Sequence, residues 1–219
     1  MKRGLLLLPV LTLLFSCGNG GEHPAFDSGA VTKTSLPRLA KYYPLDSLGA
    51  NGDTLYHTVP SDTFLAQSGR PFVTTSVNGK VVVNDFFFAS CGGTCPRMTS
   101  QLTRVQEAFR GNPDVAIVSY TVDPARDSVA SLQTYAQRFH ADTAQWKFIT
   151  GKKKNLYDLA RYGFFLPVEP GNGDSEDFIH SDQLVLVDRH ARIRGYYGGT
   201  DSAAVDSLIV DINALLKEK

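Results

Sequence analysis

The stretch from Lys80 to Thr99, KVVVNDFFFASCGGTCPRMT, constrains the fold more than any other part of the chain. Its first half, Val81 to Phe88, is a nearly continuous run of β-branched and aromatic residues, typical of a strand that is covered on both faces. Small residues follow, and Pro96 then fits the first turn of a helix, where its missing N–H costs nothing. The stretch predicts a buried strand, a short loop and a helix, with Cys91 and Cys95 at the turn.

These two cysteines are the candidates for chemistry. Peptide dipoles and free N–H groups at a helix N-terminus favour a thiolate. The chain has 3 cysteines, and Cys17 falls in the leader, so Cys91 and Cys95 are the pair of the folded part. That number excludes a disulfide-stapled scaffold. A lone pair at close spacing is more often redox-active or metal-binding than structural.

The first residues have the form of an export signal. Met1 to Ser16 has a basic start and an apolar run, Leu5 to Phe15, that is too short to span a bilayer. Leu14-Phe15-Ser16-Cys17 resembles a bacterial lipobox, in which the signal is cleaved before a cysteine that becomes lipidated. We expect a lipoprotein of the cell envelope, anchored through Cys17 on the extracytoplasmic side of a membrane. The alternative is a plain signal peptide with an incidental cysteine.

The remaining chain is expected to form one domain after a tether. Residues 17–35 are rich in Gly, Ser and Thr and read as a flexible tether, and residues 36–219 form the domain with an extended N-terminal arm at 36–62. Lys+Arg and Asp+Glu both number 22, a balance that gives no support to nucleic-acid binding. A hydrophobic content of 42% is ordinary for a globular protein.

Helices and buried strands alternate after the arm. A hairpin is expected at 64–72 with its return strand at 72–76. The expected strands are 81–88, 115–122, 146–150, 184–187 and 193–197, and the expected helices are 96–109, one starting at Asp127-Ser128, 155–162 and 202–216. This order predicts an α/β fold, a central mixed sheet flanked by helices. With a thiol pair at the first strand–helix junction, the arrangement is thioredoxin-like.

The spacing of the cysteines is C-x-x-x-C, whereas thiol–disulfide oxidoreductases mostly have two intervening residues. With three, both sulfurs can turn to one side of the first helical turn and share a metal ion. Two soft thiolates select Cu(I) or a borderline ion such as zinc.

A third ligand is needed, and the histidines are the candidates. A lone histidine most often has a structural role, so the residues alone single out none of them. His23 lies in the tether, His57 in the arm, His140 at a helix end, His190 in an expected β-turn, and His180 after a polar, Gly-rich loop.

The assembled motifs resemble the Sco/SenC family, the copper proteins involved in assembling cytochrome c oxidase. The resemblance covers roughly Tyr56 to the C-terminus. Its motifs are Asp85-Phe86-Phe87-Phe88 leading into Cys91-x-x-x-Cys95-Pro96, then Val122-Asp123-Pro124-Ala125-Arg126-Asp127-Ser128, Tyr135-Ala136-x-Arg138-Phe139, and Ile179-His180-Ser181 before a strand with Asp188.

The resemblance implies a thioredoxin-like fold and a copper site formed by Cys91, Cys95 and His180. S₂N ligation suits Cu(I), and an oxygen or water completes a Cu(II) site. The implied partners are the copper-binding subunit of a cytochrome c oxidase or another copper chaperone.

Two departures from the family pattern concern this site. Gly92 stands where the family usually has proline, which loosens the loop without metal. Ile179 stands where an acidic residue usually precedes the histidine. The sequence position next to the histidine therefore does not identify a carboxylate that would orient the imidazole in this chain.

Other residues near the motifs have two interpretations. Asp123, after the second strand, is a candidate for a carboxylate close to the metal. For Asp127 and Arg126 the simpler interpretation is favoured, in which Asp127 caps a helix and Arg126 forms a local ion pair. Met98 is a soft donor, but its helical phase with Leu102 places it in the core.

Two functions remain open from the sequence. The first is a copper metallochaperone that delivers copper to an oxidase outside the cytoplasm. The second is a thiol–disulfide reductase, with Cys91 as the nucleophile and Cys95 as the resolving thiol, that keeps the copper-site cysteines of a partner reduced. A thiol peroxidase on the same fold lacks any further signature.

Overall fold

The computed structural model describes residues 44–48, 51–167 and 181–218. The expected signal (1–16), the expected tether (17–35), Cys17 and His180 lie outside these residues. The described residues belong to a compact unit, Pro37–Lys219. Among them no helix is both long enough and apolar enough to cross a bilayer.

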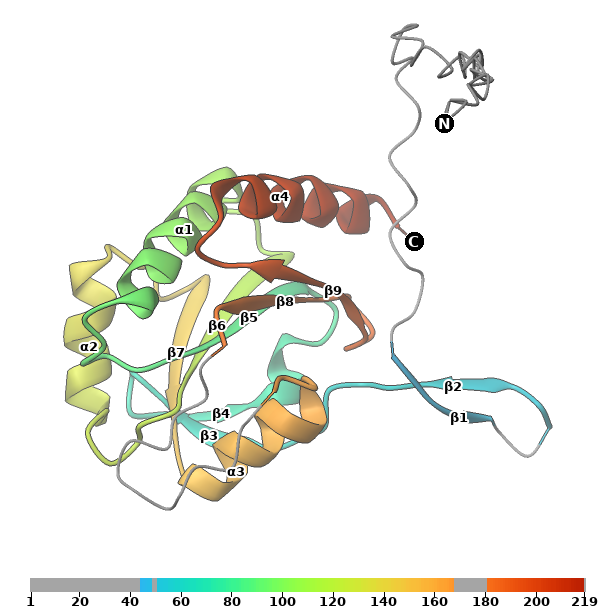
Figure 1. The fold of residues 1–219 in the computed structure, drawn as a ribbon, viewed down its shortest axis with the longest axis horizontal. Helices are drawn as coiled ribbons and strands as arrows, with labels where there is room; N and C mark the ends of the chain where they lie inside the picture. The colour runs from blue at the N-terminus through green and yellow to red at the C-terminus, as the bar shows by residue number, and fades with distance from the viewer. Residues whose placement is uncertain (1–43, 49–50, 168–180, 219) are drawn as a thin grey trace, which may run out of the picture. The chain divides into compact units, whose positions relative to one another are not determined.

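A seven-stranded mixed sheet forms the centre of this unit (Figure 1). Its strands, from one edge to the other, are β4 (Pro71–Val73), β3 (Thr63–Ala66), β7 (Trp146–Thr150), β6 (Val115–Thr121), β5 (Val81–Phe87), β8 (Gln183–Val187) and β9 (Ile193–Gly198). β5, β6 and β7 are parallel, while β8 is antiparallel to β5 and β3 is antiparallel to β7.

β5 is the strand predicted from the valine and phenylalanine run. It lies between β6 and β8, with Val83 opposite Ile117 on one side and Leu186 on the other. All 7 of its residues are buried. This explains the near-continuous apolar sequence, because both faces of a central strand are covered.

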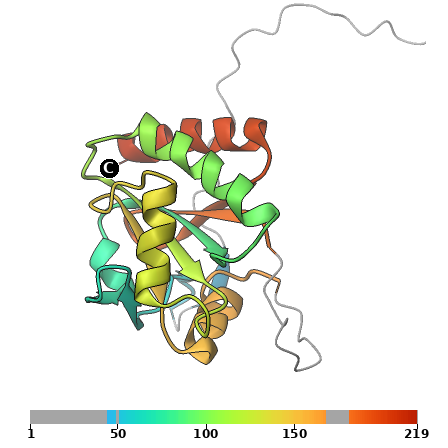
Figure 2. The same ribbon diagram turned by 90° about the vertical axis from the view of Figure 1, so that its left-hand side faces the viewer.

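Helices cover both faces of the sheet (Figures 1 and 2). The bounds are α1 (Thr94–Ala108), α2 (Val129–Arg138), α3 (Lys153–Asp158) and α4 (Ser202–Lys217). α1, α2 and α4 share one apolar cluster with Val83 of β5, and α3 shares the other cluster with Val82. The α/β thioredoxin-like fold expected from the sequence is confirmed.

Some boundaries differ from those expected. The return strand expected at 72–76 is shorter, because β4 ends at Val73 and a 3₁₀ helix, Thr74–Val77, follows. The helix expected at 155–162 is α3 followed by a π-helical turn, Leu159–Gly163. α1 begins two residues before Pro96, so Cys95 belongs to the first turn of the helix.

The described part of the arm contains a two-stranded sheet, β1 (Leu45–Leu48) with β2 (Thr54–Tyr56). Two residues that follow β2 contact the rest of the domain. The backbone N–H of Val59 donates to the carbonyl of Ala191 at 2.8 Å. Nε2 of His57, which is buried, lies 2.9 Å from the carbonyl oxygen of Gly163.

Candidate functional site

The two cysteines lie at the carboxyl end of β5. Cys91 is in the loop before α1 and is partly exposed, whereas Cys95 is in the first turn of α1 and is 7% exposed. Both thiols are free. A central strand that ends at this loop fixes where the thiols lie, because β5 is hydrogen-bonded on both sides.

The two thiols differ in acidity. Burial raises the pKa of Cys91, but the backbone N–H groups of Cys95, Gly93 and Thr94 and the Cys95 thiol together lower it below its ordinary value. Burial is also the largest effect on Cys95, where it raises the pKa to about 12, with further increases from the charges of Cys91 and Asp85. The helix N-terminus therefore favours a thiolate at Cys91 and not at Cys95.

Both cysteines line one cleft. Its walls come from the end of β5, the first turns of α1, and the segments on either side of the β8–β9 hairpin. The lining residues are Phe86, Phe88, Cys91, Gly93, Thr94, Cys95, Arg97, Met98, Ser181, Asp182 and Thr200. Segments far apart in the sequence thus meet at the thiols.

The predicted histidine ligand, His180, lies outside the described residues. Within the described part of the chain, no three Cys, His, Asp or Glu side chains form a metal-binding cluster. Ser181 and Asp182, the first described residues after His180, both line the cleft that contains Cys91 and Cys95. Asp182 is held there because its Oδ2 accepts a hydrogen bond from Thr200 Oγ1 at 2.8 Å.

Asp127 holds the cysteine loop and does not cap α2. Its Oδ2 accepts hydrogen bonds from the backbone N–H of Ala89 at 3.0 Å and from the Thr121 hydroxyl. The cap is Ser128, whose hydroxyl oxygen accepts from the backbone N–H of Ser131 at 3.2 Å. The expectation that Asp127 caps the helix was therefore wrong. Burial raises the pKa of Asp127, against the effect of these two donors.

Arg126 forms the local ion pair that was expected. Its partner is Asp123, which is 7% exposed. Asp123 is not among the described residues that line the cleft. A role for Asp123 beside the metal stays a prediction, and its carboxylate already has a cationic partner.

Asp85 is the buried acid that the sequence reading did not single out. It is 1% exposed, shares a face of β5 with Val83, and its Oδ1 accepts from the hydroxyl of Ser119. That hydroxyl oxygen in turn accepts from Trp146 Nε1 at 2.8 Å. Oδ2 of Asp85 has no hydrogen-bond partner within the described part of the chain. Burial raises the pKa of Asp85 to about 7. An acid within a strand that is apolar except for Asp85 and Asn84 was the available signal.

The other candidates have structural positions. Met98 is 1% exposed and belongs to the apolar cluster of α1, as its helical phase predicted. His140 follows α2 with φ of 51°, and its N–H donates to the carbonyl of Gln137 at 3.1 Å. His190 lies in the turn between β8 and β9, where Asp188 Oδ1 accepts from its N–H at 2.9 Å.

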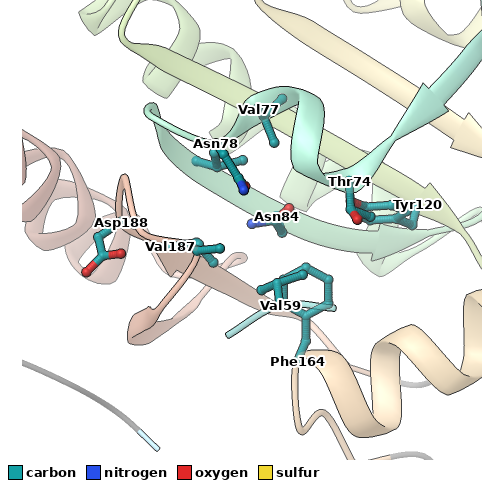
Figure 3. A pocket seen from close by; sticks show the side chains of 11 residues that line it. Val59, Thr74, Val77, Asn78, Asn84, Tyr120, Phe164, Val187 and Asp188 are labelled. Atoms are coloured by element: carbon teal, nitrogen blue, oxygen red, sulfur yellow. The ribbon is translucent and has the colours of Figure 1, made fainter. Parts of the chain in front are cut away.

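A small cavity that neither cysteine lines lies beside β5, where Val82 and Asn84 form part of its wall (Figure 3). Its volume is about 20 Å³, room for a single water molecule. Figure 3 shows the buried amide of Asn84 inside it, near Asn78 and Val187. None of the site residues predicted from the sequence lines this cavity, so it is not a competing candidate.

Gly199 should tolerate no side chain, in contrast to Gly92. A Cβ at Gly199 would lie 2.6 Å from Met98 Cγ and 2.7 Å from the Asp182 carbonyl oxygen, whereas one at Gly92 meets nothing within 4 Å. We expect Gly199→Ala to destabilise the fold by roughly 1–3 kcal/mol. The matched Gly92→Ala should stabilise it by about 0.4–1 kcal/mol, by restricting the unfolded chain. Urea denaturation measures both, and equal midpoints would contradict the close approach at Gly199.

Comparison with known proteins gives a consistent set of relatives. A family model described as SCO1/SenC matches residues 54–217. A SCO1 protein homolog of Bacillus subtilis is 29% identical over 164 residues, which cover 74% of this chain and 84% of that protein.

Solved structures agree with this. A SCO1/SenC family lipoprotein from Bacillus anthracis aligns with a TM-score of 0.67 and 29% identity, over 74% of this chain and 96% of that one. BsSco, described as having a disulfide switch and as a member of the Sco family of cytochrome c oxidase assembly proteins, aligns with a TM-score of 0.65 and 28% identity, over 74% and 95%. A copper-bound Bradyrhizobium japonicum ScoI shares the fold, with a TM-score of 0.58 and 18% identity over 72% and 99%.

Proposed function

Because the chain belongs to the SCO1/SenC family, we propose that it is an extracytoplasmic copper metallochaperone. It binds copper through Cys91, Cys95 and His180 and delivers it to the copper site of a cytochrome c oxidase. The receiving partner is the copper-binding subunit of that oxidase or another copper chaperone.

The observation that supports this most is the composition of the cleft. Ser181, the residue bonded to His180, lines the same cleft as Cys91 and Cys95 although about 90 residues separate it from them in the sequence. Consecutive Cα atoms are ~3.8 Å apart, so the chain enters this cleft directly after the histidine.

The donor set fits copper. Two reduced thiols face one cleft, and backbone N–H groups favour the thiolate form of one of them. Thiolates and an imidazole suit copper in its lower oxidation state, and a further oxygen donor suits the higher one. The site must be reduced to bind, which couples metal loading to the redox state of Cys91 and Cys95.

The proposed location is the cell envelope. The basic start, the short apolar run and the lipobox-like Leu14-Phe15-Ser16-Cys17 support lipid attachment at Cys17. The Bacillus anthracis relative, described as a lipoprotein, supports the same assignment.

The test adds copper to the reduced protein and measures stoichiometry and the visible spectrum. We expect one copper ion per chain and a thiolate-to-Cu(II) charge-transfer band that is lost in Cys91→Ser and in His180→Ala. His57→Ala is the matched control, because its ring contacts Gly163 of the fold, and it should keep the band. Binding that is unchanged in His180→Ala contradicts the assigned ligand.

A second function, thiol–disulfide reduction, is favoured by the asymmetry of the thiols. An acidic, partly exposed Cys91 beside a buried, weakly acidic Cys95 fits an attacking and a resolving thiol. Oxidase assembly in cells separates the two functions. Assembly that survives His180→Ala but fails in Cys91→Ser supports the reductase.

A further inference from the structure

We propose that the groove between the cysteine loop and α2 binds an acidic segment of the partner protein, whose carboxylates contact Arg126 and Arg138. We name it the arginine groove. Its lining residues are Ala89, Ser90, Arg126, Asp127, Ser131, Thr134, Tyr135 and Arg138. The identity of the partner rests on the proposed function, but the binding of an acidic segment does not.

The arginine groove adjoins the loop that carries the more exposed thiol. Ala89 and Ser90 form part of its lining and directly precede Cys91. The cleft that contains both cysteines is lined by the residues that follow, Cys91, Gly93 and Thr94, and shares no lining residue with the groove. A segment bound in the groove therefore lies beside Cys91 without filling the cleft.

Both arginines of the groove have exposed side chains. Arg138 is exposed and has no acidic partner among the described residues, and its guanidinium carbon lies 5.4 Å from the centre of the Phe139 ring. Arg126 is paired with Asp123, yet its side chain is 58% exposed. Guanidinium groups bind carboxylates through paired N–H donors, so both can contact an acidic segment.

The acid of the groove is turned inward. Asp127 is 1% exposed, and its Oδ2 accepts from Ala89 N–H and the Thr121 hydroxyl. It therefore presents no carboxylate to compete with a ligand. The groove offers a bound segment guanidinium groups together with the hydroxyl of Ser131, whereas the Thr134 hydroxyl donates to the carbonyl of Ala130 at 3.1 Å.

The layout suits an extended segment and not a single anion. Ser131, Thr134 and Arg138 are three and four residues apart, so they follow one another along one face of α2. Arg126 lies before the N-terminus of the same helix. The chain has equal numbers of acidic and basic residues, so this cationic groove is not a by-product of a basic surface.

The direct test measures binding of a fluorescein-labelled eight-residue peptide of alternating Glu and Gly to the metal-free full chain by fluorescence anisotropy. We expect binding that weakens about fivefold to tenfold in Arg138→Gln, through loss of one paired arginine–carboxylate contact. Arg138→Lys should fall in between, because it keeps the charge but loses the planar fork. Binding should also weaken as salt rises from low to physiological concentration.

The controls separate this groove from general electrostatics. Arg70→Gln removes an exposed arginine from the β3–β4 turn, outside the groove, and should leave the affinity unchanged. A peptide with Gln in place of Glu should not bind. Amide NMR shifts on adding the Glu peptide should map to Ser90, Ser131 and Thr134.

Three outcomes overturn the proposal: equal affinity in Arg138→Gln, equal binding of the Gln peptide, or shifts that map to another surface. A fourth is Arg138-dependent binding to vesicles with 30% anionic lipid but not to the peptide, which would make the groove a lipid site. The metal-free measurement keeps these outcomes independent of copper. If the chain binds the peptide but no copper, only the proposed copper function is contradicted, and the groove proposal stands.

Discussion

Replacing Asp85 with asparagine is expected to remove a large pH dependence of stability between about pH 4 and pH 7. Burial raises the pKa of this carboxyl from 3.8 to about 7. The folded protein therefore holds a proton there over a pH range in which the unfolded chain has lost it. The contribution of this carboxyl to stability is fully present below pH 3.8 and falls as pH rises, with the loss complete above about pH 7. About three pKa units correspond to ~4 kcal/mol.

The free energy of unfolding of the Asp85→Asn variant should therefore rise relative to that of the wild type as pH rises. At pH 4 it is expected to be equal or slightly less stable, because the amide buries an extra N–H in place of the unpartnered Oδ2. At pH 8 it should be more stable by a few kcal/mol. Urea denaturation of both reduced proteins from pH 4 to pH 8 measures this. Asp53→Asn, in the exposed turn of the arm, is the control. Parallel curves for Asp85→Asn and wild type would show that the carboxyl titrates normally.

Alkylation of the reduced protein at pH 7 is expected to modify Cys91 faster than Cys95 by about two orders of magnitude. The pKa of Cys91 lies below 9.0 and that of Cys95 at about 12, so the thiolate fractions differ at least ~1,000-fold. Higher intrinsic nucleophilicity of the more basic thiol offsets part of this, by roughly 20-fold. The burial of Cys95 slows its reaction further.

Limited iodoacetamide labelling followed by peptide mass spectrometry measures this ratio. Cys95→Ser and Cys91→Ser report each thiol alone, and denatured protein, in which the two thiols should react at similar rates, is the control. The Cys91 rate should level off at a lower pH than the Cys95 rate, which should still rise at pH 9. Comparable rates in the folded protein would contradict the asymmetry on which both proposed functions draw.

The fold was predictable where one local pattern decides the structure. The run Val81 to Phe88 predicted β5 because a nearly continuous run of β-branched and aromatic residues is typical of a strand covered on both faces. The apolar spacing in residues 202–216 predicted α4 to within a residue at its end. The π-helical turn Leu159–Gly163 was not predictable, because its apolar spacing also fits a continuous α-helix.

Contacts between distant segments decided what the sequence could not. Asp127 and Ser128 can both cap a helix through a side-chain oxygen. Asp127 instead accepts a hydrogen bond from the Ala89 N–H, 38 residues away in sequence, and Ser128 is the cap. The pairing of Cys91 and Cys95 in one cleft followed from their spacing. That Asp182 and Thr200 form the facing wall followed only from the position of β8 beside β5.

The pairing of β8 with β5 determines when during folding the cleft forms. One wall of the cleft is made by residues 86–98 and the other by residues 181–200, and β8 completes the sheet beside β5 late in the chain. Closing so long a loop precedes any gain from the contact, so this pairing is a slow, non-local step of folding. A chain made or exported N-terminus first carries both thiols well before it carries the facing wall. Nascent or truncated chains that end before residue 181 thus present Cys91 and Cys95 to oxidation before the cleft exists, and the proposed metal loading requires residues 181–200 to be in place.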